Sequence, residues 1–291
     1  LKTPTTYSWN LSIQRQVQAD WLVSASYIGT RTMHLWTHKP VNPAINISGA
    51  SVANTDQRRI LSLERPLDGQ YIGAMAEFDD GGTQIYHGML LSLQRRAARG
   101  LTFSGNYTWS HCIGSFTQAV NSLGMAATVT YTNPDDRNFD RGNCTADRRQ
   151  LFNLTALAET PQFSNRTLRM IATGWRLSAI YKAAAGEPLS ILVGTDRALT
   201  RVNSQRPDQI LASPYSDTST GPSSQYLNPA AFAPQALGTL GNVGWNNLRG
   251  PKTWSFDMAL ARTFSLREMH RMEVRAEAFN VPNHPSFGNP S

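Results

Sequence analysis

The chain has 291 residues, of which 40% are hydrophobic and only 16% are charged, with a formal net charge of +7. No run approaches the roughly 20 apolar residues that a transmembrane helix requires, which excludes a helical membrane protein. The basic residues are scattered and form no basic helix or aromatic-and-basic motif, so we expect no nucleic-acid partner. The length suits one large domain or two small ones.

The first part of the chain predicts a hairpin. Residues 7–18 alternate between apolar and polar side chains, and the alternation resumes at Trp21 after a tight turn at Ala19 and Asp20. Successive side chains of a strand point to opposite faces, so a period of two predicts a strand with one apolar and one polar side. Residues 31–85 do not alternate and are rich in Pro, Asn, Asp and Gly, which predicts a long loop.

Two further hairpins follow the same pattern. Residues 86–110 alternate on both sides of one turn, and residues 152–193 predict another hairpin with its turn near residues 162–166. We expect the return strand of this third hairpin to run from about Leu168 to Val193. The connections between hairpins are again predicted to be long loops, over residues 111–149 and 194–253.

The clearest alternation lies between Trp254 and Asn280 and predicts a fourth hairpin. Its first strand has an apolar face that only Arg262 interrupts, and its second strand is charged along the whole of its other face. A soluble sandwich would place these charges in solvent, and a membrane barrel would place them in a wet lumen. The candidate lumen-facing charges are Asp257, Arg271, Glu273, Arg275 and Glu277.

The order of short and long connections favours the barrel. Turns within hairpins are predicted to have about two to seven residues and the loops between hairpins roughly forty to sixty, which is the sorting that outer-membrane barrels show. The strand from Trp254 to Phe264 spans about 25 Å at the usual rise and tilt, the height of a lipid-facing band. We therefore predict an all-β fold, an antiparallel transmembrane β-barrel segment of about eight strands with short periplasmic turns and long extracellular loops.

Aromatic residues gather at the ends of the predicted strands, as in the two interfacial girdles of a barrel. The alternative is that they form the core of a sandwich. Arg15, Arg95 and Arg262 interrupt apolar faces a few residues before a short turn, where a guanidinium can reach lipid head groups. The candidate girdle residues are Trp9, Trp21, Trp109, Trp175, Trp254 and Phe264.

Several stretches resemble a known family: GWRLSAIYKAAAGEPLSI, YLNPAAF followed by LRGP, and MEVRAEAFNVPNHPSFGNP. They are similar to the C-terminal part of the barrel of Oar-like TonB-dependent transporters, and the resemblance covers nearly the whole chain. It implies a 22-stranded barrel in the outer membrane of a Gram-negative cell, with lipid, a plug domain, the TonB complex and an unknown substrate as partners. It also implies uptake or export of a large or scarce substrate through a polar lumen.

The resemblance also sets expectations about domain organisation. The plug, the TonB box and the family's final strand find no counterpart in these residues, so we expect residues 1–291 to be a partial barrel domain. The alternative function is that of an extracellular β-sandwich or adhesin-type binding module.

The sequence contains no HExxH, Walker, GxSxG or dinucleotide-binding motif, so we expect no enzyme activity and no cofactor or metal. Ser110 and His111 are adjacent on a strand and would face opposite sides. Residues 135–149 are dense in Asp and Arg, which indicates either a Ca²⁺ or ligand site or a self-neutralising network. Cys112 and Cys144 fall in the same predicted loop, and a loop facing the oxidising exterior predicts a disulfide between them.

Overall fold

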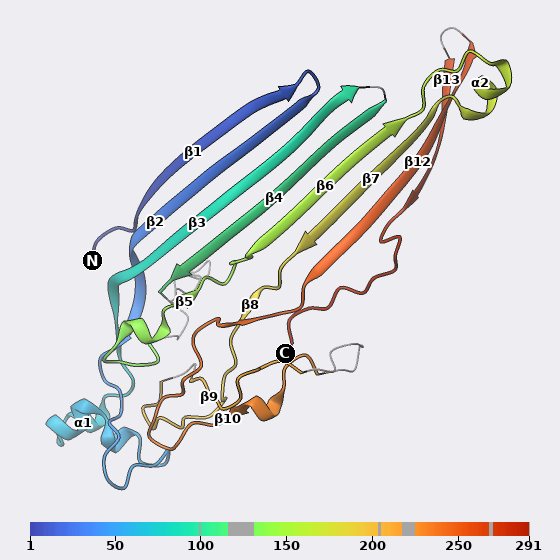
Figure 1. Ribbon diagram of the computed structural model, residues 1–291. Helices are drawn as coiled ribbons and strands as arrows, with labels where there is room; N and C mark the ends of the chain where they lie inside the picture. The colour runs from blue at the N-terminus through green and yellow to red at the C-terminus, as the bar shows by residue number, and fades with distance from the viewer. Residues whose placement is uncertain (99, 116–130, 203–204, 217–224, 268–269, 291) are drawn as a thin grey trace.

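A computed structural model describes residues 1–98, 100–115, 131–202, 205–216, 225–267 and 270–290. Its dominant feature is one antiparallel sheet (Figure 1). The eight long strands of this sheet are β1 (Thr5–Gln18), β2 (Trp21–Pro40), β3 (Ala76–Ala98), β4 (Leu101–Gly114), β6 (Gln150–Glu159), β7 (Trp175–Ala184), β12 (Thr253–Arg267) and β13 (His270–Ala278).

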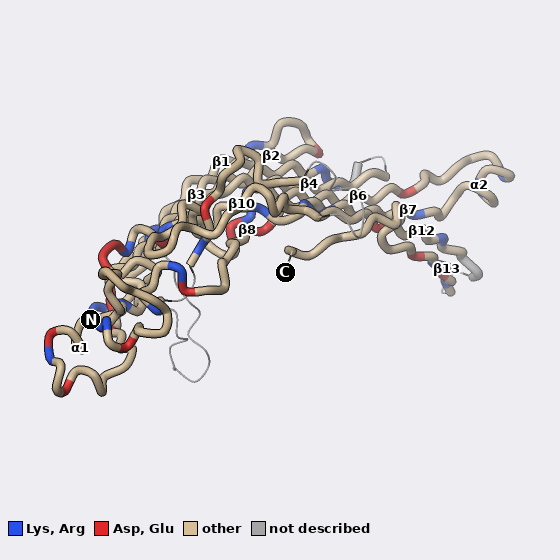
Figure 2. The backbone as a smooth tube through the Cα atoms, turned by 90° about the horizontal axis from the view of Figure 1, so that it is seen from below, with Lys and Arg blue, Asp and Glu red and all other residues tan. Residues whose placement is uncertain are grey.

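Each strand pairs with its neighbours along the chain, in the order β1-β2-β3-β4-β6-β7-β12-β13, and the short strand β5 (Gly142–Asn143) pairs with β4. All these pairings are antiparallel. Viewed from below, the strands follow one another in a shallow arc, and β1 and β13 remain apart at its two ends (Figure 2). The predicted antiparallel barrel segment of about eight strands is confirmed, as an open sheet.

The register brings the apolar sides of all the strands together. In an antiparallel pair, directly opposite residues point to the same side of the sheet. A row of opposite residues that crosses the strands therefore shows which kind of side chain lies on that side of the sheet. The row on the apolar side runs through Ile13, Ala25, Leu91, Tyr107, Phe152, Ala183 and Trp254. We call this side the apolar face.

The opposite side carries a row of polar residues that crosses the same strands. Its row of opposite residues runs through Gln14, Ser24, Ser92, Asn106, Asn153, Lys182 and Ser255. We call this side the polar face. A sheet with two such different faces separates an apolar from an aqueous environment.

Much of the apolar face is left uncovered by the residues that the structure describes. Leu11 and Ile13 are 64% and 66% exposed. Apart from the long sheet, the described residues form only two two-stranded sheets, one from β9 (Asp208–Gln209) and β10 (Phe232–Ala233), the other from β8 (Pro188–Leu189) and β11 (Leu248–Arg249). Neither is large enough to form the second layer of a sandwich, so the sandwich alternative is wrong.

Two of the strands are longer than the alternation predicts. β2 continues to Pro40 and β3 begins at Ala76, so the loop predicted over residues 31–85 spans only 41–75. In these extensions the backbone pairing continues while the apolar and polar alternation stops. The reason is that a strand beyond the hydrocarbon layer meets water on both sides, and nothing then selects apolar residues for one face.

The connection between β6 and β7 also differs from the prediction. The return strand predicted from Leu168 to Val193 is wrong at both ends, because residues 168–172 belong to the helix α2 (Arg166–Ala172) and β7 already ends at Ala184. Asn165 caps this helix, since its side-chain oxygen accepts from two backbone N–H groups of the first turn. Gly174 then turns the chain into β7 with a positive φ of 81°. Among the described residues, no helix is long and apolar enough to cross a membrane.

The three long connections lie together at one end of the sheet, below the strands in Figure 1. They comprise residues 41–75, 115–149 and 185–252. Their helices are α1 (Ile60–Glu64) and four single 3₁₀ turns, Asp56–Arg58, Gly69–Tyr71, Arg137–Asp140 and Pro229–Ala231. We call the described part of these connections the loop layer.

Candidate functional site

The polar face carries a charge cluster near the turn end of the sheet. Arg176 Nε lies 2.8 Å from Glu159 Oε1, and Arg176 Nη1 lies 3.8 Å from Glu273 Oε2. Between them lies Ala261, opposite Arg176 in the register and only 5% exposed. Because the side chain of Ala261 is small, Arg176 on β7 can pair with Glu159 on the neighbouring strand β6 and also reach across β12 to Glu273 on β13.

The other predicted lumen charges have different partners. Arg275 Nε lies 2.6 Å from Glu277 Oε1, and both side chains are about half exposed. Asp257 accepts the backbone N–H of Asn280 at 2.8 Å, which ties the chain after β13 to β12. Arg271 is exposed at the turn end of β13. Because exposed pairs contribute only about 0–1 kcal/mol, these charges matter for the chemistry of the surface more than for its stability.

The candidate girdle residues divide between the two ends of the strands. Trp9, Trp109 and Trp254 lie toward the loop layer, and the other three lie toward the short turns. At the turn end, arginines stack on the rings: Arg262 lies 5.2 Å from the centroid of Trp175 and 4.7 Å from that of Phe264. Arg95 lies over Trp21 in the same way, at 5.4 Å.

These arginines on the apolar face have protein partners that the sequence did not indicate. Arg95 Nε donates to Asp20 at 2.9 Å. Arg262 donates to the carbonyl oxygen of Met170 in α2, so the helix is attached to the apolar side of the sheet. Each guanidinium is therefore satisfied in part by protein and held at the turn end, where lipid head groups are within reach.

The loop layer is held by buried ions. Arg206 Nη1 lies 2.6 Å from Asp140 Oδ1, and the two side chains are 0% and 2% exposed. Arg206 also donates to the carbonyl oxygens of Val243 at 2.7 Å and Phe139 at 3.0 Å. The second oxygen of Asp140 accepts the backbone N–H of Thr132 at 2.6 Å. This pair joins the connection 115–149 to the connection 185–252.

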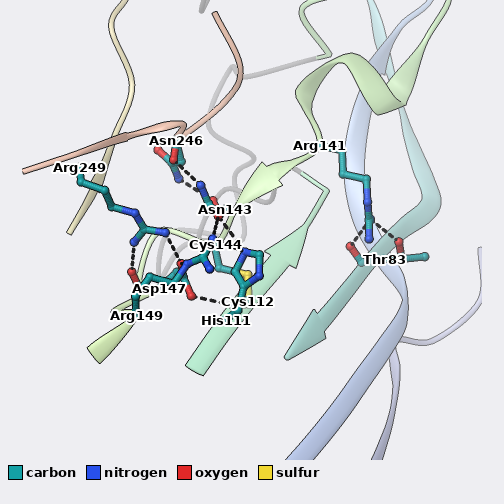
Figure 3. The surroundings of a disulfide bond; sticks show 10 residues. All are labelled: Thr83, His111, Cys112, Arg141, Asn143, Cys144, Asp147, Arg149, Asn246 and Arg249. Carbon is teal, nitrogen blue, oxygen red and sulfur yellow. Dashed lines mark hydrogen bonds and ion pairs between the residues drawn. A yellow bond between two sulfur atoms is a disulfide. The ribbon is translucent and has the colours of Figure 1, made fainter. Parts of the chain in front are cut away.

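A second junction surrounds the disulfide (Figure 3). Cys112 at the end of β4 and Cys144 in the following connection are bonded, with a Cα–Cα distance of 5.4 Å. Asp147, with a side chain only 1% exposed, accepts the backbone N–H of Cys112 at 2.7 Å. The same carboxylate receives Arg149, whose Nε lies 3.1 Å away, and Arg249 from the connection before β12. One buried carboxylate thus gathers two arginines beside the disulfide.

A third junction is made by Arg58. Its guanidinium donates to the carbonyl oxygens of Ser51 at 2.9 Å and Leu199 at 3.0 Å, and its Nε donates to Asn54 Oδ1 at 2.7 Å. Arg58 is 3% exposed. It therefore joins the connection 41–75 to the connection 185–252 from the inside.

The charged residues between 135 and 149 form a network, but its partners lie mostly outside that segment. Arg137 pairs with Asp79 and Arg148 with Glu187. No group of three or more His, Cys, Asp or Glu able to hold a metal occurs among the residues that the structure describes. The predicted self-neutralising network is thus a set of links between connections.

Two adjoining cavities lie in the loop layer. One has a volume of about 250 Å³ and is lined in part by Arg59 and Met75, and the other of about 420 Å³ is lined in part by Leu192 and Asp196. Both share Arg201 and Val202. A mixed polar and apolar lining of this size suits a small organic ligand or one end of a larger one.

Tyr131 is another buried polar residue of the layer, 2% exposed and bonded to Asp79 and Thr37. Burial, followed by the hydrogen bond to the Asp79 carboxylate, raises the pKa of the Tyr131 phenol to about 12. The neutral phenol is therefore part of the folded layer over the whole physiological pH range.

The Ser110 hydroxyl and the His111 ring have different partners. The Ser110 hydroxyl donates to the carbonyl oxygen of Arg148 at 3.0 Å, and His111 contacts Asn143 and Arg149.

Comparison with known families accounts for this combination of faces and connections. The family model described as "Outer membrane beta barrel domain" matches residues 1–291. The chain belongs to this family. Its location is therefore the outer membrane, which makes the apolar face the lipid-facing side.

Comparisons with curated proteins and with solved structures add no more specific family. No curated protein matches the sequence. Among solved structures, the outer membrane transporter YddB from Escherichia coli is similar, with a TM-score of 0.48 and 10% identity over 98% of this chain and 29% of that one. The chain thus spans less than a third of the length of that transporter.

Proposed function

We propose that this chain is part of the barrel of a TonB-dependent transporter of the Oar-like type, and that its polar face lines a water-filled passage. The observation that carries the proposal is the row of polar residues that crosses seven strands opposite a lipid-facing side, in a member of an outer-membrane barrel family. A surface of this polarity on the inner side of a barrel is a wet lumen. The more specific proposal, an Oar-like TonB-dependent transporter, is supported by the sequence resemblance.

The open sheet supports a barrel larger than these eight strands. Within the described part of the chain, β1 and β13 each pair on one side only. Unpaired backbone groups at a sheet edge cost several kcal/mol each in hydrocarbon. Further strands of the complete protein would pair both edges, in agreement with the large barrel that the resemblance implies.

The loop layer is the proposed substrate-contacting region. It covers the external end of the strands, and its two cavities meet at Arg201. Three buried junctions fix the relative positions of the connections around these cavities. Such pre-organisation reduces the entropy lost when a ligand binds.

Coupling to TonB is tested by site-specific photo-crosslinking of the complete protein in living cells. We expect a crosslink from the periplasmic side to TonB that strengthens when substrate is present. If this protein never crosslinks to TonB in cells where a known TonB-dependent receptor does, it is not a TonB-dependent transporter. The assignment to an outer-membrane barrel would be unaffected.

A further inference from the structure

A pocket of about 330 Å³ opens on the apolar face beside the loop layer. In the register, His87 lies opposite His111, and Met89 lies opposite both Tyr27 and Trp109, so these side chains share the lipid-facing side. The pocket lining includes Tyr27, His87, Met89, Trp109, His111 and Arg149. Two imidazoles and a guanidinium are an unusual set for a surface that faces hydrocarbon, where unpaired polar groups are costly.

His87 is held in place from two sides. Its Nδ1 lies 2.7 Å from the Tyr27 hydroxyl, and the two rings stack at 6.1 Å. Trp9 contacts it edge-on at 6.3 Å. The Trp9 indole lies across Gly29, where an added Cβ would come within 2.3 Å of the ring, so the close approach depends on glycine. One side of the pocket is thus a fixed aromatic wall.

The other side carries positive charge. Arg149 Nη2 lies 2.9 Å from His111 Nε2, and Asn143 Oδ1 lies 3.0 Å from the same nitrogen. Arg149 shares the Asp147 carboxylate with Arg249. One carboxylate for two guanidiniums leaves a surplus positive charge, and the Arg149 side chain is 41% exposed.

The position of the pocket decides what this charge meets. Trp9 and Trp109, 43% and 57% exposed, lie at the level of the outer girdle, where head groups begin. We propose that the pocket binds the phosphorylated head group of a glycolipid in the outer leaflet. Arg149 and His111 contact the phosphate, and the acyl chains lie along the apolar face beside Leu11 and Leu91. Arginine forms strong charge-assisted hydrogen bonds to phosphate.

The proposal rests on the membrane location of the sheet and not on transport or TonB coupling. It is tested on the complete protein, reconstituted in phosphatidylcholine nanodiscs with a bisphosphorylated glucosamine lipid, by native mass spectrometry of retained lipid. We expect Arg149→Gln to weaken retention about tenfold or more, because one charge-assisted hydrogen bond is lost. His111→Phe keeps the ring volume and should weaken retention in the same direction.

The matched control is Arg15→Gln, which removes the same charge from the same face at the turn end. It should retain the glycolipid as the unchanged protein does, and heat-modifiable migration checks the folding of each variant. The proposal is overturned if His111→Phe and Arg149→Gln retain the lipid fully, or if the dephosphorylated lipid is retained equally well. Displacement by millimolar inorganic phosphate would also overturn it, by showing a site for a free anion.

Discussion

In the sheet, large apolar side chains such as Leu11 and Ile13 point outward and remain exposed to lipid, whereas in the loop layer the largest fully buried side chains are polar and include those of Arg206, Asp140 and Gln235. The buried apolar residues of the described ranges show the same contrast, because all of them except Cys112 and Ala261 lie in the long connections. The sheet is stabilised by backbone pairing, with lipid as solvent for its apolar face. The loop layer faces water and must contain its own small core, joined by ions that are buried and paired.

Because of this difference, we expect the two regions to respond differently to mutation. A lost polar contact in the loop layer leaves a buried charge without its partner, so the cost is large and local. A change on the exposed polar face of the sheet alters mainly a surface that faces water, and its cost in stability is small.

The largest effect is expected from Arg206→Met. The substitution keeps much of the volume and leaves Asp140 buried without its partner, at a cost of about 3–5 kcal/mol to the loop layer. Hydrogen exchange should show faster opening of the segments around Phe139 and Val243, while the barrel keeps its heat-modifiable migration.

Arg201→Met is the matched control for that variant, because Arg201 is an exposed arginine of the same connection. It should leave hydrogen exchange in the layer unchanged. Equal protection in Arg206→Met and the unchanged protein would show that the buried pair does not hold the connections together.

Slightly smaller effects are expected from the disulfide. Cys112 and Cys144 are 32 residues apart, and closing a loop of that size contributes about 3–4 kcal/mol in the chain-entropy model. Cys144→Ser and the double variant Cys112→Ser/Cys144→Ser should therefore destabilise the layer equally, as measured by hydrogen exchange. Reaction of the unreduced protein with a thiol reagent at either position would contradict the bond.

The smallest of these effects concerns pH. The pKa of Tyr131 is raised from 10.0 to about 12, so the folded layer keeps a proton that the unfolded chain releases earlier. The stabilisation is complete below the ordinary pKa and is lost as pH rises through the folded value, by about 2–3 kcal/mol in total. A tyrosinate titration of the protein minus that of Tyr131→Phe should show one phenol with a midpoint near 12. A midpoint near 10.0 would refute the burial argument.

The two regions were also unequally predictable from sequence. Period-two alternation located all eight strands and their apolar sides, because lipid on one side and water on the other impose it. It failed beyond the hydrocarbon layer, at the outer ends of β2 and β3. It also failed at α2, where Leu168 and Met170 continue an alternation that the backbone does not follow.

The contacts of the loop layer leave no comparable pattern. Asp140 and Arg206 are 66 positions apart, and Arg58 reaches a carbonyl 141 positions away. Only the tertiary arrangement brings such residues together. The sequence does contain one sign of the lipid-facing pocket, because His87 interrupts an apolar face near the loop layer. Arg15, Arg95 and Arg262 interrupt apolar faces in the same way near the turns.

The two faces of the sheet meet different environments, lipid on the apolar side and water on the polar side. The direct measurement compares Ala259→Cys with Leu260→Cys, neighbours on β12 that lie opposite Ser178 and Leu177 respectively. In native outer membranes a water-soluble maleimide should label the cysteine at 259 through the lumen and leave the one at 260 unmodified until detergent dissolves the membrane. Labelling at 260 with protection at 259 would contradict the assignment of the two faces.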